Sequence, residues 1–210
     1  FVTDDDFIEL GLDIQTHVTL WKVDGIMFTN CHFSNDITTN KNNSSAPNRG
    51  IYSIDAGYKV LAGCSSIPPI GSGCRSANLL KSSFSGFQSA IEATGTGTTE
   101  SVIVQQSDFN DNIFGITVSG LNDVSINRND IEIGGSSYGS TLGIGIGIYD
   151  ATGFIVEENK VSANHTNGLY LGIGASNAGS DDNRFYKNEL NDLMFGVIGS
   201  GVNHNSNFQK

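Results

Sequence analysis

The sequence predicts an all-β protein, a single-stranded parallel β-helix of about six or seven coils, and two observations support this fold. The first is composition, because 26 Gly and only 3 Pro occur among 210 residues. Glycine lowers helix propensity and favours tight turns, and no stretch of the chain places apolar residues at helical spacing. The second is a pair of short patterns that recur about every 20 to 30 residues, which is typical of a β-solenoid.

The first pattern is an apolar residue, then a small or amide residue three positions later, then an apolar residue five positions after the first. Strands with this spacing alternate between inward and outward side chains, so only the inward residue of each strand must be apolar. Coils that stack about 4.8 Å apart turn each position into a column. The copies are Phe28, Cys31, Phe33; Leu79, Ser82, Phe84; Val104, Ser107, Phe109; Ile126, Asn129, Ile131; Val156, Asn159, Val161; and Phe185, Asn188, Leu190.

The second pattern is a small residue followed by an apolar residue, as in "GITV" from Gly115 and "GIGI" from Gly145. In these two copies the apolar residue lies ten positions before the start of the first pattern. Two independent patterns therefore keep the same order along the chain. The predicted second column consists of Ile51, Ile91, Ile116, Ile146, Leu169 and Val197.

Three copies of the first pattern carry asparagine at the middle position, namely Asn129, Asn159 and Asn188. A solenoid corner requires left-handed or bridging backbone angles, which asparagine tolerates while its side chain bonds to neighbouring backbone. Stacked asparagine amides can also bond to one another from coil to coil. We therefore predict a structural asparagine ladder at one corner.

The chain has no linker-like stretch, so residues 1–210 are predicted to form one body. Residues 55–78 interrupt the repeat and are predicted to be a loop insertion. Within it, Cys64 and Cys74 bracket "CSSIPPIGSGC", where a local disulfide is sterically plausible, the alternative being two separate thiols. Cys31 is left without a partner and is predicted to be a small buried residue.

The formal net charge is −11, from 22 acidic and 11 basic residues. Such a surface repels phosphate backbones and anionic lipid, so nucleic acid is excluded as a favoured partner. No apolar run approaches the roughly 18 residues of a membrane span, so no membrane insertion is expected.

The coils with the form "GI…V.I..N.I", the segment "NRGIYSIDAGYKV" with its Cys-containing loop, and "DDNRFYKNELNDLMFGV" resemble a known group of repeats. They are similar to the right-handed parallel β-helix repeats of large secreted surface proteins from Bacteroidetes, particularly Flavobacteria. The resemblance runs from about residue 19 onward. It implies an interior segment of a longer solenoid, exported by type IX secretion to the cell surface, with other segments of the parent protein or cell-surface proteins as partners. Right-handedness also follows the usual rule for parallel crossovers.

For function, the leading hypothesis is a non-catalytic extracellular scaffold or adhesin segment that binds glycans or protein partners. Tyr52, Tyr149 and Tyr170 each stand one residue past an apolar ladder position and are expected to face outward, where tyrosine can stack on sugar rings. The predicted outward column contains Tyr52, Glu92, Thr117, Gly147 and Tyr170, with one charged residue, which favours a scaffold over an enzyme.

The alternative is a polysaccharide lyase or glycoside hydrolase, because pectate-lyase-like enzymes share this fold. Its candidate residues are Asp181, Asp182, Arg184 and Lys187, since such chemistry uses carboxylates and a basic group. They are also explained by an ordinary turn followed by an outward-facing strand. Two segments, "TDDDF" at residues 3–7 and "SDDN" at residues 180–183, could each supply oxygen ligands to Ca²⁺. No other metal or cofactor is expected.

Overall fold

The computed structural model describes residues 16–35, 48–65, 74, 78–96, 100–134, 142–164, 168–179, 181–203 and 206–209. Over these ranges the protein is all-β, with three parallel sheets and one short antiparallel pair. None of the described residues forms a helix with the length and hydrophobicity of a membrane span.

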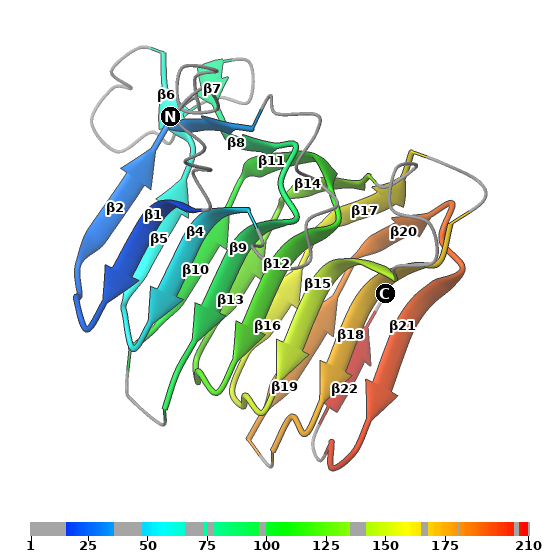
Figure 1. Cartoon of the computed structure of the whole chain (residues 1–210). Helices are drawn as coiled ribbons and strands as arrows, with labels where there is room; N and C mark the ends of the chain where they lie inside the picture. The colour runs from blue at the N-terminus through cyan, green and yellow to red at the C-terminus, as the bar shows by residue number, and fades with distance from the viewer. Residues whose placement is uncertain are drawn as a thin grey trace.

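Each turn of the chain adds one strand to each parallel sheet, except that the last described turn adds strands only to the first and second sheets (Figure 1). The first sheet contains β1 Thr16–Trp21, β4 Arg49–Ile54, β9 Ser89–Thr94, β12 Phe114–Ser119, β15 Gly143–Tyr149, β18 Tyr170–Ser176 and β21 Phe195–Ser200. The second contains β2 Ile26–Thr29, β5 Tyr58–Leu61, β10 Val102–Gln105, β13 Ser125–Asn127, β16 Ile155–Glu157, β19 Asn183–Tyr186 and β22 Ser206–Gln209. The third contains β3 His32–Ser34, β8 Ser82–Ser85, β11 Ser107–Asn112, β14 Asp130–Ile133, β17 Lys160–Ala163 and β20 Glu189–Asn191.

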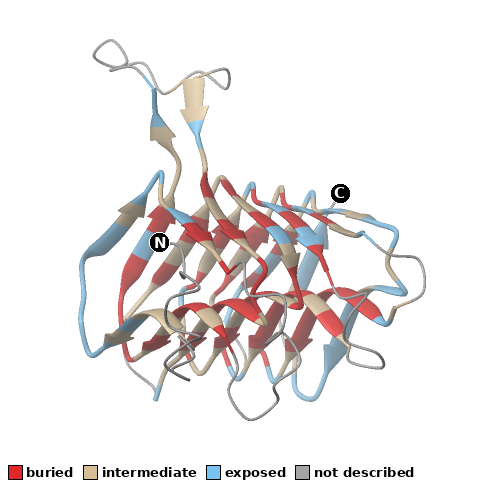
Figure 2. Ribbon diagram, turned by 45° about the horizontal axis from the view of Figure 1, so that its top comes forward, coloured by how far each residue is buried: buried red, intermediate tan, exposed pale blue. Residues whose placement is uncertain are grey.

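The chain visits the first, second and third sheets in that order and then starts again, and we call each such set of strands a coil. Consecutive coils pair in parallel, and buried residues line the space between the sheets (Figure 2). This arrangement is compatible with the solenoid that the sequence predicts.

The predicted inward columns agree with the observed register except at two positions, those predicted for Leu169 and Leu79. In the third sheet Phe33, Phe84, Phe109, Ile131, Val161 and Leu190 pair in sequence, and the first three rings stack face to face. In the first sheet Ile51, Ile91, Ile116 and Ile146 also pair as expected, but the next member is Ile173 rather than Leu169. Val197 follows Ile173 in register.

The prediction for Leu169 is wrong because "GLYLGIGA", residues 168–175, contains the small-apolar pattern twice. The structure uses the second copy, which places Gly172 next to Gly145 and leaves Leu169 exposed. A Cβ atom on Gly145 would lie 2.4 Å from Val161 Cγ1 and 2.8 Å from the Gly172 carbonyl oxygen. The small residue is therefore required where the coils approach each other most closely.

The insertion begins later than predicted. Residues 58–61 form β5, in which Val60 takes the inward position between Phe28 and Val104 that the sequence pattern gave to Leu79. Leu79 instead pairs with Cys64 in the antiparallel hairpin of β6 Gly63–Cys64 and β7 Leu79–Leu80. The structure joins Cys64 to Cys74 by a disulfide, while Cys31 is a free, partly buried cysteine.

The asparagine column forms a continuous hydrogen-bonded ladder. The Asn129 Nδ2 donates to Asn159 Oδ1 at 3.0 Å, and the Asn159 Nδ2 donates to Asn188 Oδ1 at 3.0 Å. Each of these oxygens also accepts from a backbone N–H of the preceding coil, Asn129 or Asn159. Since Asn129 and Asn159 are fully buried, these bonds satisfy backbone groups that water cannot reach.

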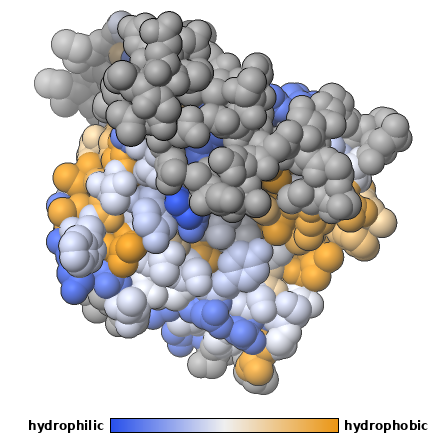
Figure 3. Space-filling model, viewed as in Figure 1, coloured by the Kyte–Doolittle hydropathy of each residue, from blue (hydrophilic) through white to orange (hydrophobic). Residues whose placement is uncertain are grey.

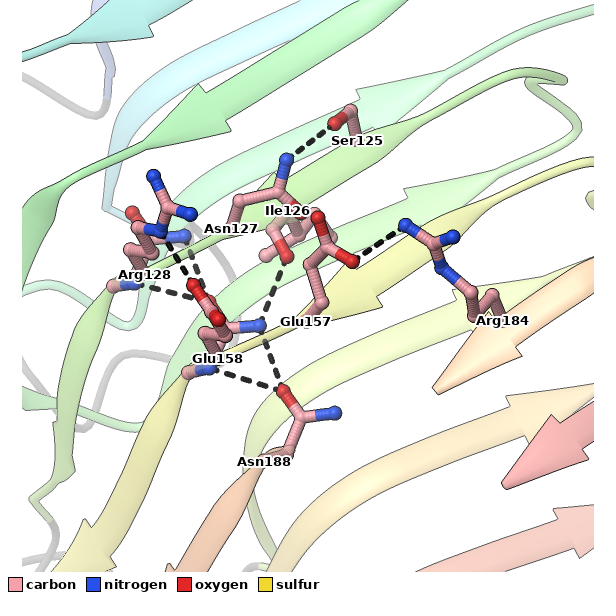
Figure 4. A network of polar contacts seen from close by, with 10 residues as sticks. Ser125, Ile126, Asn127, Arg128, Glu157, Glu158, Arg184 and Asn188 are labelled. Carbon is pink, nitrogen blue, oxygen red and sulfur yellow. Dashed lines mark hydrogen bonds and ion pairs between the residues drawn. The ribbon is translucent and has the colours of Figure 1, made fainter. Parts of the chain in front are cut away.

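The sequence predicted left-handed backbone angles at the asparagine of this corner. In the structure the residue before the asparagine has them instead. Arg128, Glu158 and Lys187 have φ values of 55°, 55° and 49°. Their side chains point outward, and Arg128 Nε donates to Glu158 Oε2 at 2.5 Å (Figure 4). At this corner one residue adopts the left-handed backbone angles of the turn, and the asparagine that follows it hydrogen-bonds to the buried backbone.

Candidate functional site

The outer face of the first sheet carries the predicted aromatic residues, with one exception. Tyr52 lies in an outward column, in which each residue pairs with the next on the neighbouring strand. The column continues with Glu92, Thr117, Gly147 and Gly174. Tyr149 lies two residues further along its strand, in an outward column with Ser119 and Ser176. Tyr52 and Tyr149 are therefore on one face but in different columns.

Tyr170 does not belong to this face. It is 4 % exposed and pairs with Gly143, where an added Cβ atom would lie 3.1 Å from its ring. The same four-residue shift that displaces Leu169 moves Tyr170 out of the predicted outward column. The Tyr170 side chain packs in the hydrophobic core, and the absence of a side chain on Gly143 leaves room for it.

An open pocket of about 230 Å³ crosses three successive strands on this face. Phe114 and Ile144 give it an apolar wall, Thr117 contributes to it from the middle strand, and Tyr149 and Glu92 also line it. Gln88 and Ser89 complete it, and we call these seven residues the first-sheet pocket. The pocket combines apolar and aromatic surface with a carboxylate, an amide and hydroxyl groups.

The orientation of Tyr149 depends on a neighbouring glycine. A Cβ atom on Gly147 would lie 2.9 Å from Tyr149 Cε2 and 3.0 Å from its hydroxyl, so the ring lies directly over Gly147. Partial burial raises the pKa of the Tyr149 phenol above its usual value. The hydroxyl is therefore neutral at physiological pH and can both donate and accept hydrogen bonds.

The carboxylate of the pocket is held by an arginine from the preceding coil. Arg49 Nε donates to Glu92 Oε2 at 2.5 Å, and the Arg49 guanidinium lies 4.6 Å from the centre of the Tyr52 ring. Because Arg49 contacts both side chains, it links Tyr52 to the edge of the first-sheet pocket. Glu92 keeps oxygen atoms that can accept hydrogen bonds from a ligand.

The four candidate residues of the enzymatic alternative make separate contacts. Arg184 Nη2 donates to Glu157 Oε2 at 2.6 Å on the second sheet (Figure 4), and the Lys187 ammonium lies 4.9 Å from the centre of the Tyr186 ring. Asp181 and Asp182 are exposed, and the Asp181 backbone N–H donates to Thr152 Oγ1 at 3.0 Å. These contacts are those of a turn and an outward-facing strand.

The sequence analysis did not predict a charged surface on the third sheet. Asp108, Asp130, Lys160 and Glu189 occupy one outward column in successive coils. Each directly follows the small or asparagine position of the first pattern, so the register could have revealed them. An open pocket of about 250 Å³ lies here, lined by Asn110, Asp130, Ile131, Glu132, Lys160, Val161, Ser162 and Asn191, and we call it the third-sheet groove.

Lys81 connects two of these carboxylates, with its ammonium 2.7 Å from Asp108 Oδ1 and in contact with Asp130 Oδ2. Burial disfavours the ammonium, but the hydrogen bonds to the two carboxylates outweigh it and raise the pKa of Lys81. Lys81 is thus a fixed positive charge between two coils.

The two predicted Ca²⁺ segments differ in what the structure describes. Residues 3–7 and Ser180 lie outside the described ranges. In the second segment the buried Asn183 Oδ1 already accepts from the Gly153 backbone N–H at 2.9 Å. Among the described residues, no group of three or more His, Cys, Asp or Glu side chains is placed to hold a metal ion.

Comparison of the chain with family models, with curated proteins and with solved structures finds no match.

Proposed function

We propose that the protein is a non-catalytic extracellular scaffold, a right-handed parallel β-helix of about six or seven coils, that binds glycans through the first-sheet pocket. The supporting observation is the pocket itself, where Tyr149 and Phe114 lie beside Glu92 on three successive coils. Rigid strands hold these side chains, so the site is formed before a ligand arrives.

The chemistry of the pocket fits a sugar ring. One face of a pyranose is apolar and can stack on an aromatic side chain, while its hydroxyls need donors and acceptors around the edge. Tyr149 offers the ring, and Glu92, Gln88 and Thr117 offer polar atoms. The volume of the pocket is about 230 Å³.

An extracellular location is part of the proposal. The Cys64–Cys74 disulfide supports it, because such bonds persist mainly in oxidising compartments. Other segments of a parent protein, cell-surface proteins or polysaccharides would then be the partners.

A glycan array probed with the purified protein tests this function, with and without Ca²⁺ and chelator. Tyr149→Ala should lower binding of any positive glycan about fivefold, since stacking of a sugar on an aromatic ring contributes about 1 kcal/mol. Tyr186→Ala is the matched control, because Tyr186 is also an outward tyrosine but lies on the second sheet. Equal losses in both variants, or no binding to any glycan, would contradict the proposal.

The third-sheet groove supports a second candidate, a polysaccharide-active enzyme. A catalytic groove gathers charged side chains from several coils, and Asp130, Glu132 and Lys160 meet here. Release of reducing or unsaturated ends from an acidic polysaccharide would identify this activity. Its loss in Glu132→Gln, with retention in Glu157→Gln on the second sheet, would place the reaction in this groove.

A further inference from the structure

The outer face of the first sheet between β4 and β18 carries two charged side chains, Arg49 and Glu92. The outward residues of these strands form three columns, in which each residue pairs with one on the next strand. Among the described members of these columns, all the others are uncharged. This face is turned toward the viewer in Figure 3, where its middle shows mostly pale surface of intermediate hydropathy. The first-sheet pocket therefore lies on a face with a single pair of opposite charges.

Arg49 and Glu92 neutralise each other. Arg49 Nε donates to Glu92 Oε2 at 2.5 Å, and the two side chains are 21 % and 30 % exposed. An anionic sugar would bring its carboxylate or sulfate close to Glu92, and the arginine that could bind it is already paired. A cationic sugar would have to compete with Arg49 for the carboxylate. Because a charge that loses water without gaining a partner is costly, the pocket favours an uncharged sugar.

The apolar wall of the pocket requires an apolar group on the ligand. Phe114 and Ile144 pair in register on neighbouring strands, and both side chains are partly buried although they point outward. A sugar hydroxyl placed over this wall would lose water without gaining a hydrogen bond. A substituent that ends in a methyl group would instead bury apolar surface there. The wall therefore favours a sugar that carries such a substituent over a simple hexose.

The pocket also offers a carboxylate oxygen for a donor on the same substituent. Glu92 pairs with Thr117 on the neighbouring strand, and both line the pocket together with the apolar wall. Arg49 bonds to Oε2, and no described residue bonds to Oε1. An ionised carboxylate accepts hydrogen bonds and cannot donate them, so it selects a ligand N–H or O–H. An acetamido group combines both requirements, because its N–H lies close to its methyl group.

We propose that the first-sheet pocket selects an uncharged sugar with an acetamido group, an N-acetylhexosamine. The sugar ring stacks on Tyr149, the acetamido N–H donates to Glu92 Oε1, and the methyl group packs against Phe114 and Ile144. This inference rests on the proposed glycan binding and names the class of sugar. A 6-deoxy sugar would also bring a methyl group to the wall, but it would leave Glu92 without the amide donor.

Titration of the ¹⁵N-labelled protein with methyl glycosides of N-acetylglucosamine, glucose and glucosamine tests the selection, since these sugars differ only at one ring position. The corresponding galactosides form a second set. We expect amide shift changes centred on Thr117 and Gly147, and in at least one set about fivefold tighter binding of the N-acetyl sugar, from one buried methyl group and one hydrogen bond. Equal affinities within each set would overturn this inference and leave glycan binding intact. No shift with any sugar, together with a silent glycan array, would refute both.

Two protein variants separate the contributions of the wall and of the charge pair. Phe114→Ala should remove the preference for the N-acetyl sugar, whereas Ile155→Ala, an outward apolar residue of the second sheet, should retain it. Glu92→Gln leaves Arg49 without its carboxylate, so this variant should bind methyl glucuronide, which the unchanged protein should not bind. A preference that survives Phe114→Ala, or glucuronide binding by the unchanged protein, would overturn the proposal.

Discussion

The interior coils and the last coil use the same types of residue with different results. Val156 and Phe185 are buried in the second sheet, whereas Phe208, which stacks on Phe185 with ring centres 4.6 Å apart, is largely exposed. Phe185 has a neighbouring strand on both sides, whereas Phe208 has a described neighbouring strand on one side. Burial in this fold is therefore decided by neighbours rather than by residue type, as expected where each repeat contacts only adjacent repeats.

The largest effect should come from Asn159→Ala. The change removes both ladder bonds and the bond from Nδ2 to the Ile126 carbonyl at 2.9 Å, leaving several buried groups without partners. We expect a loss of about 3 to 5 kcal/mol in the free energy of unfolding, measured by urea denaturation. Asn188→Ala, at the last described position of the ladder, should cost about half as much or less. Equal losses would show that interior and end positions do not differ.

Ile146→Ala should cost about 3 kcal/mol, because it leaves a cavity in a fully buried column. Val197→Ala, in the same column, should cost about 1 kcal/mol or less, since Val197 is exposed on one side. Thermal unfolding of both variants measures the contrast. A larger shift for Val197→Ala would contradict the exposure of Val197.

The first coil can be probed through pH. Burial lowers the pKa of His17 in β1 to about 4, and its ring packs edge-on against Phe87 with centres 4.9 Å apart. The unfolded chain binds a proton at this side chain below about pH 6.5, whereas the folded protein does so only near pH 4. Stability should therefore fall as pH drops from 6.5 to 4. The fall should be smaller in His17→Phe, as urea midpoints across this range will show, and identical pH profiles would refute the burial of His17.

The smallest effect is expected on the outer face. Glu157 makes an ion pair with Arg184, but both side chains are solvated, and such pairs contribute about 0 to 1 kcal/mol. Glu157→Ala should shift the unfolding midpoint little, and salt should remove the remaining difference. A loss comparable with that of Asn159→Ala would show that the assigned inward and outward registers are wrong.

Much of the fold could be read from the sequence, because core columns and ladder residues recur at regular spacing. The third-sheet column from Phe33 to Leu190 and the amide column from Asn129 to Asn188 agree with the structure. The prediction failed where the spacing was ambiguous. Two small-apolar copies stand side by side in residues 168–175, and the insertion separates Val60 from Ser82 and Phe84, so that Leu79 fits the spacing although Val60 takes the inward position. Pattern alone cannot choose between copies that are equally apolar.

The candidate sites were harder to predict than the core. Tyr149 and Glu92 were recognised as outward residues, but the contributions of Phe114 and Ile144 to one pocket were not. Likewise, the charges at Asp130, Glu132 and Lys160 are far apart in the chain and meet only through the register. Outward residues follow no repeat, so only the alignment of strands reveals which of them are neighbours.

The sequence by itself determined that the chain forms short parallel strands with Gly at close approaches and Asn at one corner, because these requirements are local and repeat in every coil. Only the tertiary structure decided which copy of a pattern enters the core and which outward side chains share a pocket. These features depend on contacts between coils that lie far apart in the sequence, as between Tyr149 and Thr117 or between Asp130 and Lys160. Packing in three dimensions, rather than residue type, assigns them.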